Sequence, residues 1–393
     1  MIFSDSLRKT KTLVFFPPNR NAALSLILAV INSIFVLKYA GRIGFSFLAF
    51  VYFIGVLVVL KIFTSFNDRS KRFMDRKSFV AFLSLLSIIV LLSVCIFPNE
   101  SRVARLPAIS EWITLFLSGK FPYGGSMNPS GFPFLFFLAI PFYYLGNIGL
   151  LEAAGILIFG VTLLKKNEPE IKNDWVQLIV LLLLPSVYYE FITRSELFFN
   201  ISLCLSLISV ADSYLTDKVI DAKFLLIAIA FGLVLSTRLI VVPVFLIFLI
   251  YKFRRSFTYG IIFSMVGISV FMLTIIPFLI CNASQFISHG PLKMQLAYLP
   301  KWEIFATVFA SVILGFASKN FKDVSGFAGM TIFGVVSLAF LSAASQVGLA
   351  QVIFMDKFDV SYFILSVPLL LYSLELHPVA ESVAPSGLCE IGN

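Results

Sequence analysis

Long apolar blocks separated by short charged breaks constrain this chain more than any other feature. The blocks are about 15 to 24 residues long, the length that an α-helix needs to cross roughly 30 Å of hydrocarbon. The chain of 393 residues is 59% hydrophobic and only 13% charged, whereas soluble domains carry about 25% charged residues. A water-soluble fold cannot hide that much apolar surface. The sequence therefore predicts an all-α, polytopic transmembrane helical bundle.

The apolar blocks predict about 12 helices. They cover residues 22–40, 44–64, 79–97, 148–164, 175–192, 197–215, 223–237, 239–253, 257–280, 303–317, 324–346 and 361–377. A further block, Gly131 to Gly146, contains Pro133 and Pro141 and follows Pro129. Irregular backbone is tolerated at membrane depth only beside protein or a water-filled cavity. We therefore expect a re-entrant or interfacial segment there.

The distribution of Lys and Arg predicts the orientation, because these residues concentrate on the cytoplasmic side of a membrane. If the block from Gly131 to Gly146 does not cross, the predicted inner segments hold 20 of the 30 Lys and Arg residues. If it crosses, the split becomes 15 to 15. A single long helix through Thr237 and Arg238 would also invert everything downstream. We expect two helices there and an integral, multi-pass protein of a bacterial cytoplasmic (inner) membrane.

The net charge of +9 is explained by this cytoplasmic excess. No basic helix or aromatic-basic platform accompanies it, so no nucleic-acid partner is expected. Four widely spaced cysteines, without CxxC spacing, argue against a disulfide or metal framework. They are Cys95, Cys204, Cys281 and Cys389.

The predicted outer loops are about 98–147, 193–196, 281–302 and 347–360, together with the turn at Arg238. They contain many charged residues: Glu100, Arg102, Arg105, Glu111, Lys120, Arg194, Glu196, Arg238, Lys293, Lys301, Asp356, Lys357 and Asp359. Lys and Arg are normally rare on the outer side, so their presence there needs an explanation. Binding of an anionic phosphate at the outer leaflet would explain it. The active face is therefore expected to be the outer one.

The first outer loop predicts an interfacial helix between Pro107 and Gly119, where apolar residues alternate with Ser110, Glu111 and Ser118. The sequence GKFPYGG then turns sharply, and PSGFPFL returns to the membrane. An acid on an amphipathic helix, then Gly-x-x-Pro-Tyr, then a Pro-containing apolar segment resembles the first outer loop of the C-type (GT-C) integral membrane glycosyltransferases.

Three later segments are similar to that superfamily in order and sidedness. PSVYYEFITRSE, residues 185–196, resembles the second outer turn, which places an acid just before a helix re-enters, here Glu196. LSTRLIVVP, around Arg238, resembles the short basic turn before a Pro-bearing helix. DKFDVSYFILSVP, residues 356–368, resembles the last outer loop. The resemblance covers roughly Phe79 to Pro378.

The resemblance implies a domain organisation. Residues 1–78 would be a cytoplasmic basic leader, two N-terminal transmembrane helices and a basic cytoplasmic loop. These helices precede the region where the family normally begins. Residues 79–378 would be the transmembrane catalytic region, and residues 379–393 a disordered tail.

The resemblance also implies site roles, in which a carboxylate acts as general base and guanidinium groups stabilise the departing phosphate. Glu111 or Glu100 is the expected base. The family's acid is usually an Asp well upstream of Gly-x-x-Pro-Tyr, where this chain has Ala104 or Arg105, so the choice stays open. The expected substrate and phosphate contacts are Arg102, Arg105, Lys120, Tyr123, Arg194, Glu196, Arg238 and Asp359. No Asp-x-Asp occurs in the first loop, so no metal cofactor is expected.

Three function hypotheses follow. The first is transfer of a hexose, mannose-like or glucose-like, from a polyprenyl-phosphate carrier to a glycan or lipid acceptor. Its partners would be the lipid-linked sugar donor, the acceptor and membrane lipid. The alternatives are a surface-polysaccharide polymerase of the O-antigen type and a non-enzymatic flippase or transporter. Transport predicts internal repeats and charges near the midplane, and no convincing repeat is visible. These residues also have purely structural interpretations. Glu111 would then only form the polar face of its helix, and Arg194 and Glu196 would only cap helix ends.

Overall fold

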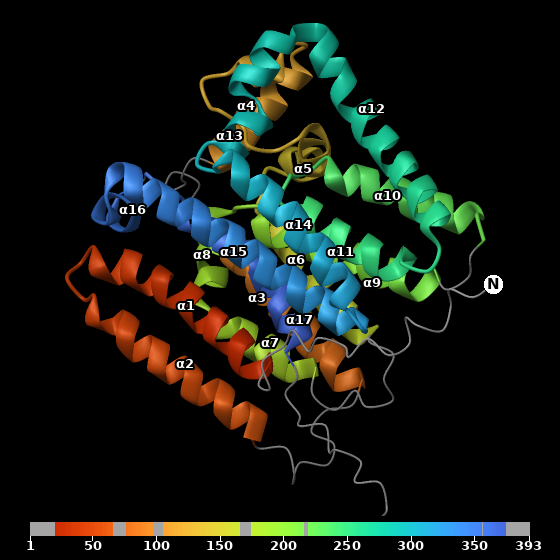
Figure 1. Cartoon of the computed structure of the whole chain (residues 1–393). Coiled ribbons are helices and arrows are strands. Elements are labelled where there is room, and N and C mark those ends of the chain that lie inside the picture. The colour runs from red at the N-terminus through yellow and green to blue at the C-terminus, as the bar shows by residue number, and fades with distance from the viewer. Residues whose placement is uncertain are drawn as a thin grey trace, which may run out of the picture.

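The computed structural model describes residues 20–65, 76–96, 105–165, 174–215, 219–355 and 357–374. All regular structure in these ranges is helical (Figure 1), which confirms the predicted all-α fold class. The expected leader and tail, and the residues Glu100, Arg102 and Asp356, lie outside the described residues.

Most of the described helices pack side by side into one bundle (Figure 1). The bundle consists of α1(Arg20–Gly41), α2(Phe47–Ser65), α3(Arg76–Ile96), α6(Leu150–Leu164), α7(Asp174–Leu182), α8(Pro185–Thr193), α9(Leu197–Tyr214), α10(Ala222–Leu235), α11(Val241–Phe253), α12(Phe257–His289), α14(Lys301–Ala317), α15(Phe321–Val347), η5(Val360–Ser366) and α17(Val367–Ser373). Shorter elements gather near one end: α4(Arg105–Leu117), η4(Pro122–Gly124), α5(Pro133–Tyr144), α13(Pro291–Leu296) and α16(Leu349–Phe354).

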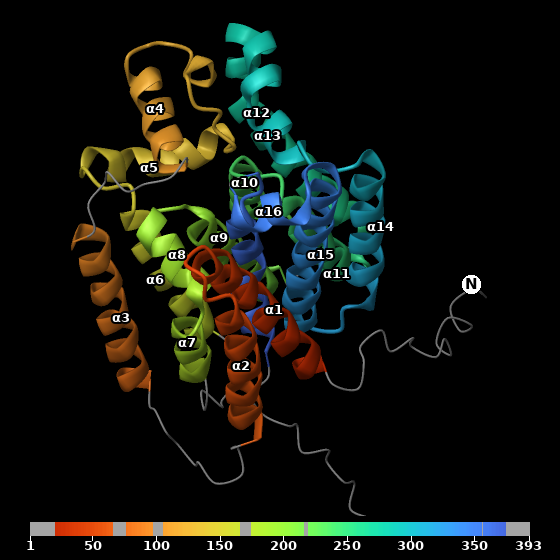
Figure 2. The same ribbon diagram turned by 90° about the vertical axis from the view of Figure 1, so that its left-hand side faces the viewer.

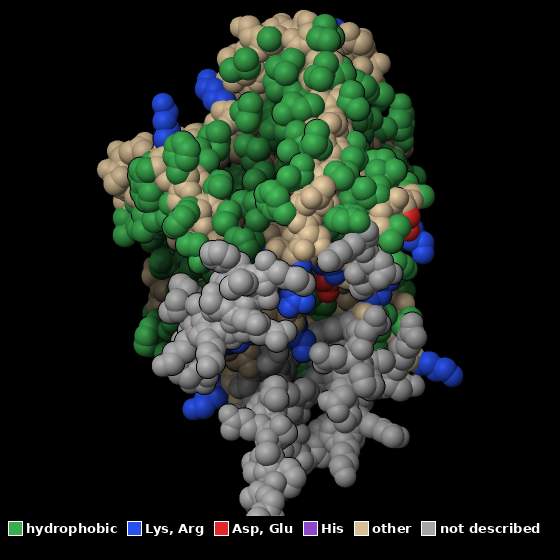
Figure 3. All heavy atoms as spheres, turned by 45° about the vertical axis from the view of Figure 1, so that its right-hand side comes forward, with side chains coloured by type: hydrophobic (Ala, Val, Ile, Leu, Met, Phe, Trp, Pro, Cys, Tyr) green, Lys and Arg blue, Asp and Glu red, His purple; other side chains and the backbone are tan. Residues whose placement is uncertain are grey.

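Five described helices are long and apolar enough to cross a membrane, and the pair α7 and α8, bent by 66°, would make a sixth. Apolar side chains cover much of the surface in Figure 3, while Lys and Arg side chains gather mainly in its lower part. An exposed apolar surface of this extent is typical of lipid contact. These helices and this surface are consistent with a multi-pass membrane protein. The expected count of about 12 membrane helices is not confirmed.

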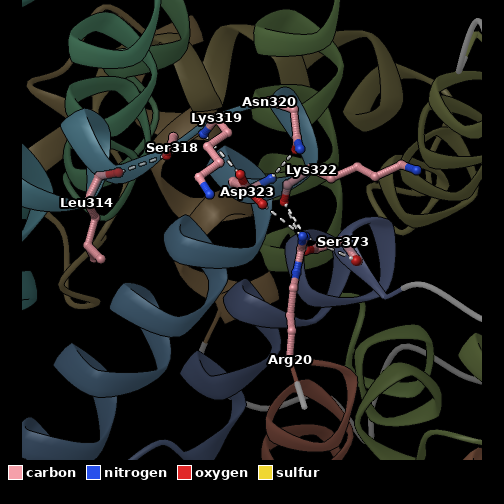
Figure 4. A network of polar contacts seen from close by, with 8 residues as sticks. All are labelled: Arg20, Leu314, Ser318, Lys319, Asn320, Lys322, Asp323 and Ser373. Carbon is pink, nitrogen blue, oxygen red and sulfur yellow. Dashed lines mark hydrogen bonds and ion pairs between the residues drawn. The ribbon is translucent and has the colours of Figure 1, made fainter. Parts of the chain in front are cut away.

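One end of the bundle, called the inner end here, is held by contacts at or near the segments that the sequence predicts to be cytoplasmic. Arg20 at the start of α1 donates from Nη1 to Asp323 Oδ1 at 2.8 Å, and Figure 4 shows its approach to the turn between α14 and α15. Lys252 pairs with Asp212 at 2.8 Å. These contacts join α1 to α15 and α9 to α11 at this end.

The opposite end, called the outer end, carries α4 and the turn between α10 and α11. Phe132 N, just before α5, donates to Thr237 O in that turn at 3.0 Å. The 12 residues of α5 span only about 18 Å, but α10 and α11 are nearly as short, so the direction of α5 and not its length distinguishes it. Figure 2 shows α5 lying across the bundle. The structure thus agrees with a segment that does not cross, and it separates α10 from α11 as expected.

An aromatic cluster joins α4 to α5 and α12 at the outer end. Trp112 is buried and stacks on Phe136 with ring centroids 4.3 Å apart. Tyr123 packs edge-on against Phe286 of α12 at 4.9 Å. Amphipathic spacing in α4 therefore places its apolar face on protein, whereas an interfacial helix of the predicted kind turns that face to lipid.

One predicted boundary was close and another was wrong. The helix expected to end at residue 280 is interrupted at Asn282, and a second helical stretch then continues α12 to His289 inside the loop expected at 281–302. Asn282 leaves helical geometry and bends α12, and its Oδ1 accepts a hydrogen bond from Gln285 N at 3.1 Å. This bond starts a new helical turn, which apolar periodicity does not reveal. The last helix, expected at 361–377, begins as the 3₁₀ segment η5 before α17.

Candidate outer-end functional site

Three outer-end segments that are distant in sequence meet around Arg105, the first residue of α4. Its Nη1 donates to Ser195 Oγ at 3.0 Å, and its Nη2 donates to Asp359 Oδ2 at 2.5 Å. The guanidinium also lies over the ring of Tyr362, 4.5 Å from the centroid. The segments before α9 and η5 are therefore held to α4 by one cation.

The second cation of the site is Arg238, in the turn between α10 and α11. Its Nη2 forms an ion pair with Glu196 Oε1, and the two side chains are only 2% and 1% exposed. Arg238 Nε and Nη1 are also buried but have no hydrogen-bond acceptor among the described residues. Buried donors without an acceptor are costly and need an explanation. The explanation that the chemistry suggests is an anionic ligand.

Two buried glutamates, which the sequence reasoning did not single out, complete the charge cluster. Glu190 of α8 interacts electrostatically with Arg105 and Arg238, and Glu152 of α6 interacts with Glu190 and Arg105. Both are fully buried, and neither carboxylate oxygen of Glu152 has a hydrogen-bond partner among the described residues. They lie inside the predicted helices 175–192 and 148–164. An ionisable residue within such a segment is itself a signal of function.

The two arginines differ in how their charge is balanced. Burial opposes the charge of Arg105, but Asp359, Tyr362 and Glu190 outweigh it and raise the pKa of this guanidinium. Burial lowers the pKa of Arg238 to about 10, although Tyr362 and Glu190 favour its charged form. Each arginine has one carboxylate partner, Glu196 for Arg238 and Asp359 for Arg105. What distinguishes Arg238 is its two buried nitrogens without an acceptor among the described residues, to which an added anion would bring hydrogen bonds.

Asp359 is held in its charged form. Burial raises the pKa of its carboxyl group, but Arg105 and the hydrogen bonds from Ser361 outweigh burial and lower it below the ordinary value. Ser361 donates to Asp359 Oδ1 from both its backbone nitrogen and its hydroxyl, at 3.0 and 2.6 Å. Asp359 is thus suited to positioning Arg105 and poorly suited to taking up a proton.

A cavity of about 280 Å³ opens beside Arg238. Its wall is mostly apolar and comes from α11, α14, α15 and the segment after α12, with Arg238 and Tyr362 among the few polar residues. Gln295 closes one side: its Oε1 accepts from Leu239 N at 2.9 Å, and its Nε2 donates to Ser130 O at 2.6 Å. A guanidinium in the wall of an apolar cavity suits a ligand with a lipid chain and an anionic head.

Glu111, an expected base, lies in a different set of contacts. Its two carboxylate oxygens accept hydrogen bonds from Ser126 N, Ser126 Oγ and Met127 N at 2.7 to 2.8 Å. Burial raises the pKa of Glu111, but these hydrogen bonds outweigh burial and lower it. These hydrogen bonds hold the loop after η4 against α4. A carboxylate held in this way is a weak proton acceptor.

The remaining expected site residues do not join the cluster around Arg105. Lys120 is exposed in the turn after α4, and Tyr123 is buried in the aromatic cluster, with its hydroxyl donating to Gly131 O at 3.2 Å. Arg194 adopts a left-handed conformation, with φ of 52°, at the end of α8. It donates to Val94 O in the last turn of α3 at 2.5 Å, which is the helix-capping role considered above. Glu100 and Arg102 are outside the described residues.

The cluster brings together Arg105, Glu196, Arg238 and Asp359 from the sequence expectations, and adds Glu152, Glu190, Ser195 and Tyr362. Among the described residues, no group of three or more His, Cys, Asp or Glu side chains could hold a metal ion. The arrangement offers two guanidiniums for an oxyanion and buried carboxylates for proton transfer. Comparisons with protein-family models, curated proteins and solved structures gave no match for this chain.

Proposed function

We propose that this protein is a membrane glycosyltransferase that takes a hexose from a polyprenyl-phosphate carrier at the non-cytoplasmic face. The observation that carries the proposal is Arg238, whose buried Nε and Nη1 lack an acceptor and whose side chain lines the apolar cavity. A lipid-linked phosphate supplies both an apolar chain for the cavity and oxygens for the guanidinium. In this proposal about 12 helices cross the membrane, with the N-terminus in the cytoplasm.

The same contacts assign roles in the proposed reaction. A carboxylate removes the proton of the acceptor hydroxyl, the hydroxyl oxygen bonds to the anomeric carbon, and the bond from that carbon to the carrier phosphate breaks. The leaving phosphate keeps the electron pair and is stabilised by Arg238 and Arg105. Asp359 and Tyr362 position Arg105.

Among the described acids, Glu190 is the best candidate for the base. Its carboxyl group interacts electrostatically with both Arg105 and Arg238. Asp359 and Glu111, in contrast, are each held as carboxylates by hydrogen bonds. Glu100 remains the alternative base, because the resemblance places the catalytic acid in the first outer loop. A positioned general base contributes roughly 10²- to 10⁴-fold to such a reaction.

The test is a transfer assay with purified protein and a panel of radiolabelled polyprenyl-phosphate hexoses. We expect label in a glycan or lipid acceptor and release of the carrier phosphate, both lost in Arg238→Gln. Transport of an intact lipid-linked sugar across reconstituted vesicles, with no bond broken, would instead establish a flippase. Joining of two lipid-linked glycans would establish a polymerase.

A further inference from the structure

The inner end contains a second cavity, of about 470 Å³, far from the proposed active site in the fold. It lies where α9, α11 and α14 end and where α10 and α12 begin. Four cations line it, together with two tyrosines: Lys252, Arg254, Arg255, Tyr251 and Tyr259 from the connection between α11 and α12, and Lys319 from the turn between α14 and α15. Its volume lies within the range of roughly 300 to 1,000 Å³ that is typical of small-molecule sites.

The cations around this cavity are only partly compensated. Lys252 is paired with Asp212 at 2.8 Å, and Arg254 donates to the carbonyl oxygens of Phe316 and Ser318 at 3.2 and 3.0 Å. Those bonds satisfy the end of α14 but bring no negative charge. Within the described ranges, neither Arg255 nor Lys319 forms an ion pair. Among the residues that the structure describes, three positive charges therefore face one cavity without an ion-pair partner.

The cytoplasmic preference of Lys and Arg explains why these residues lie at this end, but it does not explain their convergence on a cavity. Lys319 reaches it from the turn between α14 and α15, which Figure 4 shows beside Asn320 and Asp323. In that turn Lys319 N donates to Asp323 Oδ2 at 2.9 Å, and Asp323 is engaged by Arg20. The backbone of Lys319 is thus fixed while its side-chain charge remains available.

We propose that this cavity, the basic inner pocket, binds the phosphate of an anionic lipid headgroup from the cytoplasmic leaflet. Like charges around one cavity repel, and a phosphate relieves that repulsion while accepting hydrogen bonds from the cations and the tyrosine hydroxyls. The leaflet that faces this end carries anionic lipids and concentrates them near basic surfaces. The pocket is lined by helix ends, and in this proposal those ends lie at the membrane surface, within reach of a headgroup.

The experiment measures lipid binding to the full-length protein in detergent, with phosphatidylglycerol as the probe and phosphatidylcholine as the zwitterionic comparison. We expect the double variant Arg255→Gln with Lys319→Gln to bind phosphatidylglycerol about tenfold more weakly, because each lost cation removes a charge-assisted hydrogen bond. The matched control is Lys223→Gln, which removes an exposed inner-end cation that stacks on Tyr214 and does not line the pocket.

Equal affinity in the wild-type protein and the double variant would overturn the proposal, as would an equal loss in Lys223→Gln. If inorganic phosphate displaces the lipid at equal concentration, the pocket serves a soluble phosphate and the lipid assignment fails. Should the double variant fold poorly, the charge-conserving pair Arg255→Lys with Lys319→Arg must retain binding. Sugar transfer reports on the outer end separately, so the two proposals can fail independently.

Discussion

At the outer end, Arg238 and Glu196 are almost completely buried and form an ion pair. At the inner end, Arg255 and Lys319 are exposed and form no ion pair within the described part of the chain. Buried charges depend on their partners, because removing one partner leaves the other without compensation. Exposed charges are screened by water and salt and contribute little to stability. The comparison teaches that substitutions at the outer end should affect folding and function together, and substitutions at the inner end should separate them.

The largest expected effect comes from breaking the Arg238–Glu196 pair. Arg238→Met alone should lower the free energy of unfolding by about 3 to 5 kcal/mol, because Glu196 is left buried and charged. The double variant Arg238→Met with Glu196→Leu should recover most of that loss but show no transfer. Thermal unfolding in detergent and the radiolabel assay measure the two effects. Full transfer by the double variant would remove Arg238 from the proposed site.

The second effect separates the acids. Glu190→Gln should reduce transfer by roughly 10²- to 10⁴-fold while preserving expression, since Gln keeps the size of the side chain. Glu111→Gln should change transfer far less, because Glu111 holds the loop after η4 and has a lowered pKa. The measurement is kcat with saturating donor for both variants and for Glu100→Gln. A large loss in Glu100→Gln together with an active Glu190→Gln would move the base to the first outer loop.

A smaller effect concerns acid stability. The pKa of Asp359 is lowered in the folded protein. The charged Asp359 carboxylate therefore stabilises the fold fully above its ordinary pKa near 3.9, and this contribution is lost as the pH falls through the lowered pKa. The unfolding free energy of the wild type should therefore fall more steeply than that of Asp359→Asn between about pH 5 and pH 2. Parallel pH profiles for the two proteins would contradict the assigned ion pair with Arg105.

The smallest effect is expected at the inner end, where Arg20 joins α1 to α15. Arg20 and Asp323 are only 16% and 11% exposed, and Arg20 also donates to Lys322 O, so Arg20→Gln should lower the unfolding free energy by about 1.5 to 3 kcal/mol. Transfer should be unchanged, because the contact lies at the end opposite to Arg238. A loss of transfer without loss of stability would show that the two ends are coupled. Arg20→Lys serves as the charge-preserving control.

The helices were predictable because hydrocarbon imposes a length and a composition on any segment that crosses it. The separation of α10 from α11 followed from Thr237 and Arg238, and the short α5 followed from its prolines. The bend at Asn282 was not predictable, because it depends on one side chain accepting a bond from Gln285 N within an otherwise apolar block.

The site was predictable only in part, because charge and position in a loop do not specify where a side chain points. Arg194 and Glu196 are two residues apart, yet Arg194 turns to Val94 and Glu196 turns to Arg238. The left-handed backbone at Arg194 separates their directions. Glu190 could have been found from its position in an apolar block, where an ionisable side chain needs a partner.

The bend of α12 also bears on how the protein can be produced. Asn282, Ala283 and Ser284 form an acceptor sequence for N-linked glycosylation in a eukaryotic secretory pathway. Asn282 Nδ2, the atom that would carry the glycan, donates to Gln285 Oε1 at 3.1 Å, and Oδ1 starts the next helical turn. A glycan attached there would compete with the bend, so a yeast or insect-cell host calls for Asn282→Asp. That substitution keeps the accepting oxygen and removes the attachment point.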